Sequence, residues 1–428
     1  MADKRVLLAG GSVVDPAAGR VRRLDVLIAD GVIAEVGGKL SAPGANRVDL
    51  RGRYIAPGFV DMHCHLREPG YEEAETIETG TRAALAGGFT RVCPMPNTDP
   101  PVDTEAMVRF QIQRGDEAGY CHVHPVGCCT KARAGRELAE IGSMVQSGAV
   151  AVSDDGAWVA DPMVMRRVLE YAKAFDVPVI SHCELAGVPG VANEGLVSTR
   201  LGLAGQSYVA ETAAAARDIM LAEAVGARLH IAHVSCAATV ELVRWARGRG
   251  VPVTAEACPH HFTLTEDALG DFDTNCRVNP PLRTEADRQA VIGGIVDGTI
   301  EVIATDHAPH TRERKEVEFD NAAPGMTGFE TAFSLGFEQL VLPGLLTIPE
   351  YVARLTVGPA RILGLPVPRV EAGVEAELVF LDPKLAWTYT ADGVMSRSRN
   401  SPFIGRGMKG MVVGGMLGDE QFWLLHQD

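Results

Sequence analysis

The chain has 428 residues, 46% of them apolar and 22% charged, which is the composition of a globular enzyme with one large core and a smaller unit. Its net charge of −15, with no basic cluster, argues against a nucleic-acid-binding protein. We expect neither a membrane span nor a signal peptide, because no apolar run is long enough and none follows residues 1–5. Nine scattered cysteines favour reduced thiols and a cytoplasmic protein.

Both ends of the chain are predicted to consist of short β-strands separated by Gly- and Asp-rich turns, without helical periodicity. The strand candidates are residues 5–8, 25–29 and 32–36 near the start, and residues 376–381, 411–413 and 422–425 near the end. We therefore expect residues 1–54 and 366–428 to pack together as one small domain, with residues 55–365 as a separate central domain.

The central region alternates short apolar runs with amphipathic stretches, which predicts a (β/α)8 barrel. The expected strands are residues 55–62, 90–95, 123–126, 149–153, 177–181, 228–232, 251–256 and 301–305. The expected helices include residues 78–86, 162–175, 211–225, 239–249 and 285–297. A doubly wound sheet is the competing fold. It would carry a Gly-rich phosphate-binding turn after its first strand, and this sequence has none there.

A His-x-His pattern stands at the end of the first expected barrel strand. On a strand, residues two apart point to the same side, so His63 and His65 aim two imidazoles at one point, with Arg67 beyond them. Imidazole pairs of this kind suit Zn²⁺, and the arginine supplies a planar fork for a carboxylate.

Polar residues also follow the other expected strands, at the end of a barrel where active sites lie. They are Asn97, Asp154, Asp155, His182, His233, Asp306 and His310. Asp154 and Asp155 are adjacent, so we expect at most one of them to point into the barrel. Four histidines and two aspartates at one rim could hold one or two divalent metals, and Zn²⁺ is the ion that this donor set favours. Such a metal lowers the pKa of a bound water to about 7, and an aspartate can carry its proton to a leaving nitrogen.

Two further histidine pairs are left outside this predicted ligand set. His122 and His124 form another His-x-His, but they begin the third expected strand and so belong to the opposite face of the barrel. His260 and His261 follow the seventh strand at the correct rim, where we expect them to be supporting or loop residues.

Together these motifs resemble those of bacterial type I dihydroorotases in the amidohydrolase superfamily, over essentially the full length of the chain. The motifs are residues 61–70 (DMHCHLREPG), 95–98 (MPNT), 153–156 (SDDG), 256–261 (EACPHH), 278–283 (VNPPLR), 305–310 (TDHAPH) and 328–331 (GFET). The resemblance implies a metal-dependent barrel with a small β-sandwich built from both chain ends. It also implies the reversible cyclisation of N-carbamoyl-L-aspartate to L-dihydroorotate in de novo pyrimidine biosynthesis, driven by a zinc-bound hydroxide.

The resemblance also assigns roles to individual residues. It implies metal ligands at His63, His65, Asp155, His182, His233 and Asp306. Among these, Asp155 would bridge two zinc ions and Asp306 would be the catalytic acid and base. The implied substrate contacts are Arg67 and Asn97 to the carboxylate, then Asn279, His310 and the backbone at Pro324 and Gly325.

The sequence departs from related patterns at two points. Many relatives bridge their metals with a carbamylated lysine on the fourth strand, where this chain has Asp154 and Asp155. That difference favours a type I dihydroorotase over a hydantoinase or dihydropyrimidinase, and it leaves the number of metals open. Pro324 stands where a phenylalanine is common; because proline has no N–H, a backbone contact would come from Gly325 or from the Pro324 carbonyl.

Two other functions are weighed against this one. The first is another cyclic amidase, such as an allantoinase or hydantoinase, which Arg67 and Asn97 disfavour because they suit a substrate with a carboxylate. The second is a non-catalytic scaffold for aspartate transcarbamoylase, which would be expected to have lost metal ligands. A homo-oligomer and an active complex with aspartate transcarbamoylase both stay open.

Overall fold

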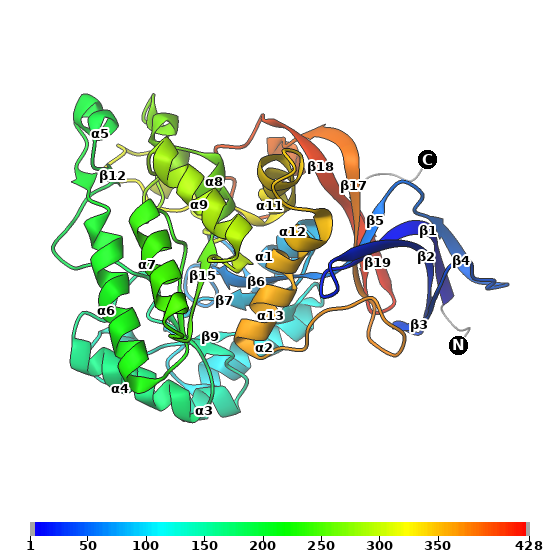
Figure 1. Ribbon diagram of the computed structural model, residues 1–428, viewed down its shortest axis with the longest axis horizontal. Coiled ribbons are helices and arrows are strands. Elements are labelled where there is room, and N and C mark those ends of the chain that lie inside the picture. Colours follow the sequence, from blue (N-terminus) through cyan, green and yellow to red (C-terminus); the bar gives the residue numbers. More distant parts are fainter. Residues whose placement is uncertain (1–4, 425–428) are drawn as a thin grey trace.

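The two ends of the chain form one sheet in the computed structural model, which describes residues 5–424. Its strands are β1 (Arg5–Asp15), β2 (Arg20–Ala29), β3 (Val32–Gly37), β4 (Asn46–Asp49), β5 (Tyr54–Pro57), β17 (Glu377–Thr388), β18 (Gly407–Leu417) and β19 (Glu420–Trp423). Their order is β19-β18-β17-β5-β1-β2-β3, with β4 paired to β1. Figure 1 shows the blue and red strands of the two ends side by side, beside the helices of the central region.

The antiparallel pairing of β5 with β17 joins the two ends, with Ile55 opposite Phe380. These two side chains pack with Leu8 and Ile28 in a core of the terminal sheet that is separate from the core of the barrel. The prediction that both ends pack together is therefore confirmed. Leu425, the last residue of one expected strand, lies outside the described residues.

The central region is a barrel of parallel strands. They are β6 (Phe59–Cys64), β7 (Phe89–Pro94), β8 (His122–Val123) with its continuation β9 (Val126–Gly127), β10 (Ala151–Val152), β11 (Val179–Ser181), β14 (Leu229–Ile231), β15 (Val253–Ala257) and β16 (Val302–Ile303). The first and last strands close the barrel, because the Asp306 N–H donates to the His63 carbonyl at 2.9 Å and the His65 N–H to the His307 carbonyl at 2.8 Å. The fold class predicted from the sequence is confirmed.

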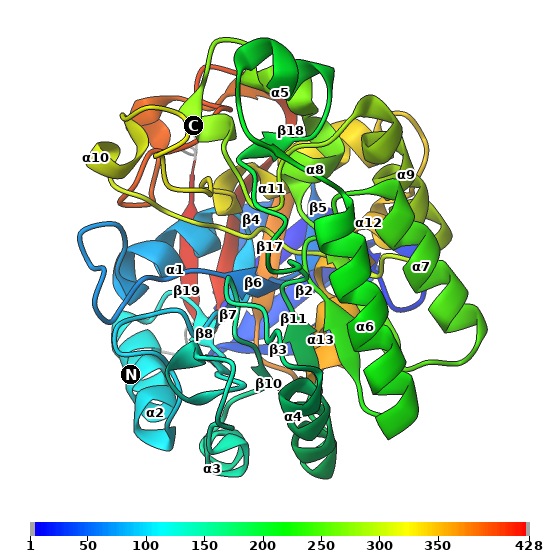
Figure 2. The same ribbon diagram turned by 90° about the vertical axis from the view of Figure 1, so that its left-hand side faces the viewer.

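Helices surround these strands, as Figure 2 shows with the barrel seen from the side of α4 and α6. They are α1 (Ile77–Ala86), α2 (Glu105–Ala118), α3 (Ile141–Gln146), α4 (Pro162–Ala174), α5 (Leu196–Leu201), α6 (Val209–Val225), α7 (Ala237–Gly248), α8 (Pro259–Thr263), α9 (Glu285–Asp297), α10 (Arg312–Lys315), α11 (Phe329–Gly336), α12 (Ile348–Leu355) and α13 (Val357–Leu363). Two short strands, β12 (Ala192–Asn193) and β13 (Gly205–Gln206), flank α5. The start of α4 follows from local sequence, because the Asp161 carboxylate accepts from the N–H groups of Met163 and Val164 and Pro162 occupies the first turn.

Some strand limits differ from the prediction. The apolar run 55–62 is divided between β5 in the terminal sheet and β6 in the barrel. The division falls at Gly58, whose N–H donates to the Glu377 carbonyl at 2.9 Å and where a Cβ would collide with the Thr90 side chain. The domain limits at residues 54 and 365 stay predictions, and β5 runs across the first of them.

The expected turn at Gly10 and Gly11 is part of a strand instead. Both residues lie inside β1, where a bulge between Leu8 and Gly11 shifts the pairing with β2. The nine cysteines are all buried and unpaired. Within residues 5–424, no helix is both long enough and apolar enough to cross a membrane.

Candidate metal centre and active site

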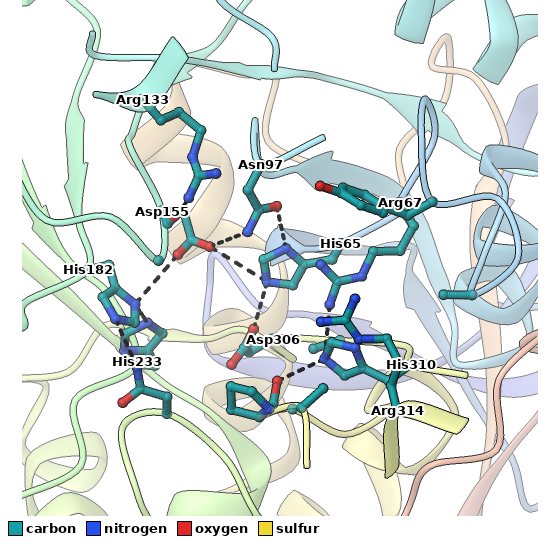
Figure 3. A pocket seen from close by; sticks show the side chains of 18 of the residues that line it. His65, Arg67, Asn97, Arg133, Asp155, His182, His233, Asp306, His310 and Arg314 are labelled. Carbon is teal, nitrogen blue, oxygen red and sulfur yellow. Dashed lines mark hydrogen bonds and ion pairs between the residues drawn. The ribbon is translucent and has the colours of Figure 1, made fainter. Parts of the chain in front are cut away.

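The carboxyl ends of the barrel strands bring the six predicted metal ligands together at one rim, and Figure 3 shows five of them, all except His63. His63 and His65 lie at the end of β6, and the others follow β10, β11, β14 and β16 in turn. All six are buried: His63, His65, Asp155, His182, His233 and Asp306. All predicted site residues except His63 line one cavity of about 350 Å³.

Asp155 lies between two groups of imidazoles. Its Oδ1 is 3.4 Å from His63 Nε2 on one side and 3.7 Å from His182 Nδ1 on the other. His182 Nδ1 is in turn 2.8 Å from His233 Nε2, so these two ring nitrogens converge on one point, as ligands of a common ion do. Asp155 therefore lies within 4 Å of ring nitrogens on both sides, and its bridging role stays a prediction.

Glu256 on β15 fixes the tautomer of His63. The Nδ1–H of His63 donates to Glu256 Oε1 at 2.5 Å, which leaves a lone pair on Nε2. That Nε2 is buried and has no hydrogen-bond partner among residues 5–424, which costs free energy unless a cation occupies the space in front of it. The other Glu256 oxygen accepts from His230 Nε2 at 3.1 Å. The sequence argument did not single out Glu256, although a carboxylate inside an apolar strand signals a buried partner.

His65 is held in the same way by Asn97. The Nδ1–H of His65 donates to Asn97 Oδ1 at 2.9 Å, so the lone pair of Nε2 faces Asp306 Oδ1 at 3.1 Å. Two acceptors this close also indicate a place for a cation. Asn97 Nδ2 donates to Asp155 Oδ2 at 3.0 Å, so Asn97 contacts two predicted ligands as well as the cavity.

Both carboxylates of the centre are held in the ionised form. Burial alone would raise the pKa of Asp155 and of Asp306; protonated His63 and His65 lower both values, and a bound cation would do the same when the two rings are neutral ligands. Ionised carboxylates are ready metal ligands, and an ionised Asp306 is also a proton acceptor.

Glu184 is a second residue that the sequence argument missed. Its Oε2 accepts from His182 Nε2 at 3.0 Å and from Asn279 Nδ2 at 2.9 Å. The hydrogen bond from His182 lowers the pKa of Glu184 to about 2. Glu184 therefore orients one predicted ligand and one predicted substrate contact together.

The opposite side of the cavity is cationic. Arg67 donates through Nε to the Pro309 carbonyl at 3.1 Å, and among residues 5–424 no carboxylate lies within ion-pair distance of it. Burial lowers the pKa of Arg67 to about 10, which leaves it charged at neutral pH. Arg314 in α10 and Arg133, both absent from the prediction, line the same cavity, and Arg133 donates through Nη2 to the Asp155 carbonyl. An anionic ligand therefore finds positive charge opposite the metal-binding rim.

The backbone groups predicted to contact substrate already form hydrogen bonds to other groups of the protein. The Pro324 carbonyl accepts from His310 Nε2–H at 2.8 Å, and the Gly325 N–H donates to the Arg277 carbonyl at 2.8 Å. A substrate contact at either residue would compete with these bonds, and that contact stays a prediction.

The residues set aside by the sequence argument lie apart from the cavity. Asp154 turns away and accepts from the N–H groups of Cys129 and Thr130 at 2.9 and 3.1 Å, as expected for one member of an adjacent pair. His122 lies 3.9 Å from Glu375 in the segment that leads into the terminal sheet. His260 and His261 are buried in α8 and do not line the cavity.

Comparison with known proteins shows the family to which this chain belongs. A family model described as Dihydro-orotase-like matches residues 52–239. The dihydroorotase of Pelotomaculum thermopropionicum is 50% identical over 417 residues, covering 96% of this chain and 97% of that protein. The chain belongs to the dihydroorotase family. The dihydroorotase of Syntrophotalea carbinolica is 48% identical over 412 residues, covering 96% of each chain.

Solved structures support the fold alone. An L-hydantoinase (dihydropyrimidinase) from Arthrobacter aurescens superposes with a TM-score of 0.87 at 23% identity, covering 97% of this chain and 95% of that one. A dihydropyrimidinase from Brevibacillus agri superposes with a TM-score of 0.82 at 22% identity, covering 97% and 94%. Dihydroorotases are cyclic amidohydrolases, so membership of the family confirms the resemblance and the enzyme class predicted from the sequence.

Proposed function

We propose that this chain is a dihydroorotase that interconverts N-carbamoyl-L-aspartate and L-dihydroorotate in de novo pyrimidine biosynthesis. One observation carries the proposal: a rim of imidazoles and carboxylates shares one cavity with Arg67, which has no carboxylate partner in the described part of the chain. The rim suits hydrolysis or closure of an amide, and Arg67 suits a substrate that carries a carboxylate.

The donor set fits Zn²⁺, with one or two ions per chain. His63, His65 and Asp306 would hold one ion, His182 and His233 the other, and Asp155 would lie between them. The orphaned Nε2 of His63 is the observation that supports a metal here. When bound, a divalent metal lowers the pKa of water to about 7 and polarises the amide carbonyl.

The residues of the chain bind the substrate and move its proton. Arg67 pairs with the substrate carboxylate through two parallel N–H donors, which fixes the ring or the open chain against the rim. Asp306, ionised among the imidazoles, takes a proton from the attacking water and delivers it to the ring nitrogen. Ring closure follows the same steps in reverse, with Asp306 accepting the proton of the attacking nitrogen.

The remaining predicted contacts complete the binding side. Asn279, oriented by Glu184, and His310, beside Arg67, face the cavity from two further loops. We assign both to the substrate, together with Asn97 and the backbone at Pro324 and Gly325.

A turnover assay tests this function. L-dihydroorotate and N-carbamoyl-L-aspartate are supplied to zinc-loaded and chelator-treated protein, with allantoin and a hydantoin as comparison substrates. Interconversion of the first pair alone, lost on chelation and restored by zinc, is the expected result. Turnover of allantoin or the hydantoin instead would mean that Arg67 does not bind a carboxylate.

Protein that binds zinc but turns over none of these substrates would favour the scaffold function. Adding aspartate transcarbamoylase to such protein would then separate a true scaffold from an enzyme that needs this partner.

A further inference from the structure

A buried asparagine from the far end of the chain lies behind the substrate side of the cavity. Asn400 belongs to the segment that joins β17 to β18, and it is 4% exposed. This segment and α10 line the same groove next to His310. The predicted site residues all precede residue 326, so Asn400 brings a distant part of the sequence to the site.

The side chain of Asn400 spans two loops of the cavity. Its Nδ2 donates to the carbonyls of Ala308 and Gly325 at 3.0 and 3.1 Å, and its Oδ1 accepts from the His310 N–H at 3.0 Å. Its own carbonyl accepts from the Thr327 N–H at 2.9 Å. The orientation of the amide is thereby fixed, since the donors face two carbonyls and the acceptor faces an N–H.

These bonds hold the two loops at close approach. A Cβ at Gly325, where φ is +131°, would collide with the Ala308 side chain, so the loops are already in contact. Two carbonyls that point toward the same place repel each other unless a donor lies between them, and the Asn400 amide is that donor. Lys315 supports the same loop, because its Nζ donates to the Gly325 carbonyl at 3.0 Å.

We propose that Asn400 is a positioning residue that sets His310 and Gly325 at the distance required to bind substrate. This inference rests on the proposed function. Asn400 has no hydrogen bond to any of the six predicted metal ligands, so it acts on substrate binding and leaves the metal centre unchanged.

Asn400→Asp is the most direct test. The aspartate has the size of asparagine and still accepts from the His310 N–H, but it lacks both N–H donors and places negative charge opposite two carbonyls. We expect KM for L-dihydroorotate to rise about 10- to 100-fold, with metal content as in the wild type and a smaller change in kcat. Ser401→Ala is the matched control, because Ser401 is also buried but its hydroxyl accepts only from the Phe403 N–H of its own segment.

A second measurement covers the case in which Asn400→Asp folds poorly. Asn400→Ser is combined with His310→Ala, and the KM of the double variant is compared with the two single variants. If Asn400 acts through His310 and Gly325, Asn400→Ser raises KM less in the His310→Ala background than in the wild type, whereas fully multiplied effects overturn the proposal. A variant with a lowered melting temperature but a wild-type KM overturns the proposal as well, because that result indicates a purely structural role. Absence of dihydroorotate turnover in the wild type contradicts the proposed function instead.

Discussion

Replacing Glu256 by glutamine should weaken metal binding without unfolding the barrel. Glu256 is fully buried and touches no solvent, and its carboxylate accepts from His63 Nδ1, from His230 Nε2 and from the His233 N–H at 3.3 Å. Glutamine has one acceptor oxygen where the carboxylate has two. It can therefore serve His63 or His230 but not both, and it removes the negative charge that makes the His63 ring a stronger ligand.

The size of the effect follows from those contacts. A hydrogen bond to a charged group contributes about 1.5–3 kcal/mol, and loss of a partner that orients a metal-binding histidine weakens metal affinity about 10- to 100-fold. At about 1.4 kcal/mol per tenfold, the two figures agree. We therefore expect the zinc dissociation constant of Glu256→Gln to rise by one to two orders of magnitude, and excess zinc to restore most of the turnover.

Zinc retained after dialysis against a graded series of chelator concentrations measures this change. Glu377→Gln is the control, since Glu377 is a buried carboxylate that pairs with Arg91 outside the cavity. It should lower the melting temperature and leave zinc affinity unchanged. If Glu256→Gln held zinc as tightly as the wild type, orientation of His63 by Glu256 would be refuted.

Four other substitutions test the assignments of the site and one buried acid. Asp306→Asn should lower kcat about 10²- to 10⁴-fold with little change in KM, and zinc content measured alongside separates loss of the proton carrier from loss of a ligand. Arg67→Lys should raise KM about tenfold because an ammonium cannot form two parallel bonds, and an unchanged KM would remove the carboxylate assignment. Arg314→Gln should raise KM a few-fold at low salt and less at high salt, whereas Arg312→Gln, which loses only an exposed ion pair, should not. Burial raises the pKa of Glu330 from 4.5 to about 7, so its contribution to stability is lost as pH rises through that interval. The melting temperature of the wild type relative to Glu330→Gln should therefore fall between pH 5 and pH 8, and a constant difference would contradict the buried acid.

The rim of the barrel could be predicted from the sequence because strand ends and chemistry coincide there. Apolar runs locate the strands, and in a parallel barrel every strand end faces the same side, so His63, His182, His233 and Asp306 could be grouped without knowledge of distances. The same reasoning could not place Glu256, because it lies within its strand and its partners come from two other strands.

Residues away from the strand ends could not be found from local patterns. Arg133 and Arg314 line the cavity and Asn400 lies behind it, and each belongs to a segment whose path depends on the packing of the whole molecule. The break at Gly58 was missed for a related reason. The run 55–62 is apolar throughout, and only the close approach of Thr90 shows why one strand becomes two.

The pairing of β5 with β17 has a consequence for how the chain is made. Pro57 lies opposite Leu378, so β5 leaves the ribosome long before its partner exists. One edge of β5 stays unpaired while the whole barrel is synthesised, and β6, which carries His63 and leads directly into His65, begins at Phe59 just after it. A nascent or truncated chain without β17 therefore exposes an unpaired strand edge, the kind of surface that recruits other chains into aggregates. Pairing of β17 with β5 covers that edge, directly before the strand that leads to the first two imidazoles.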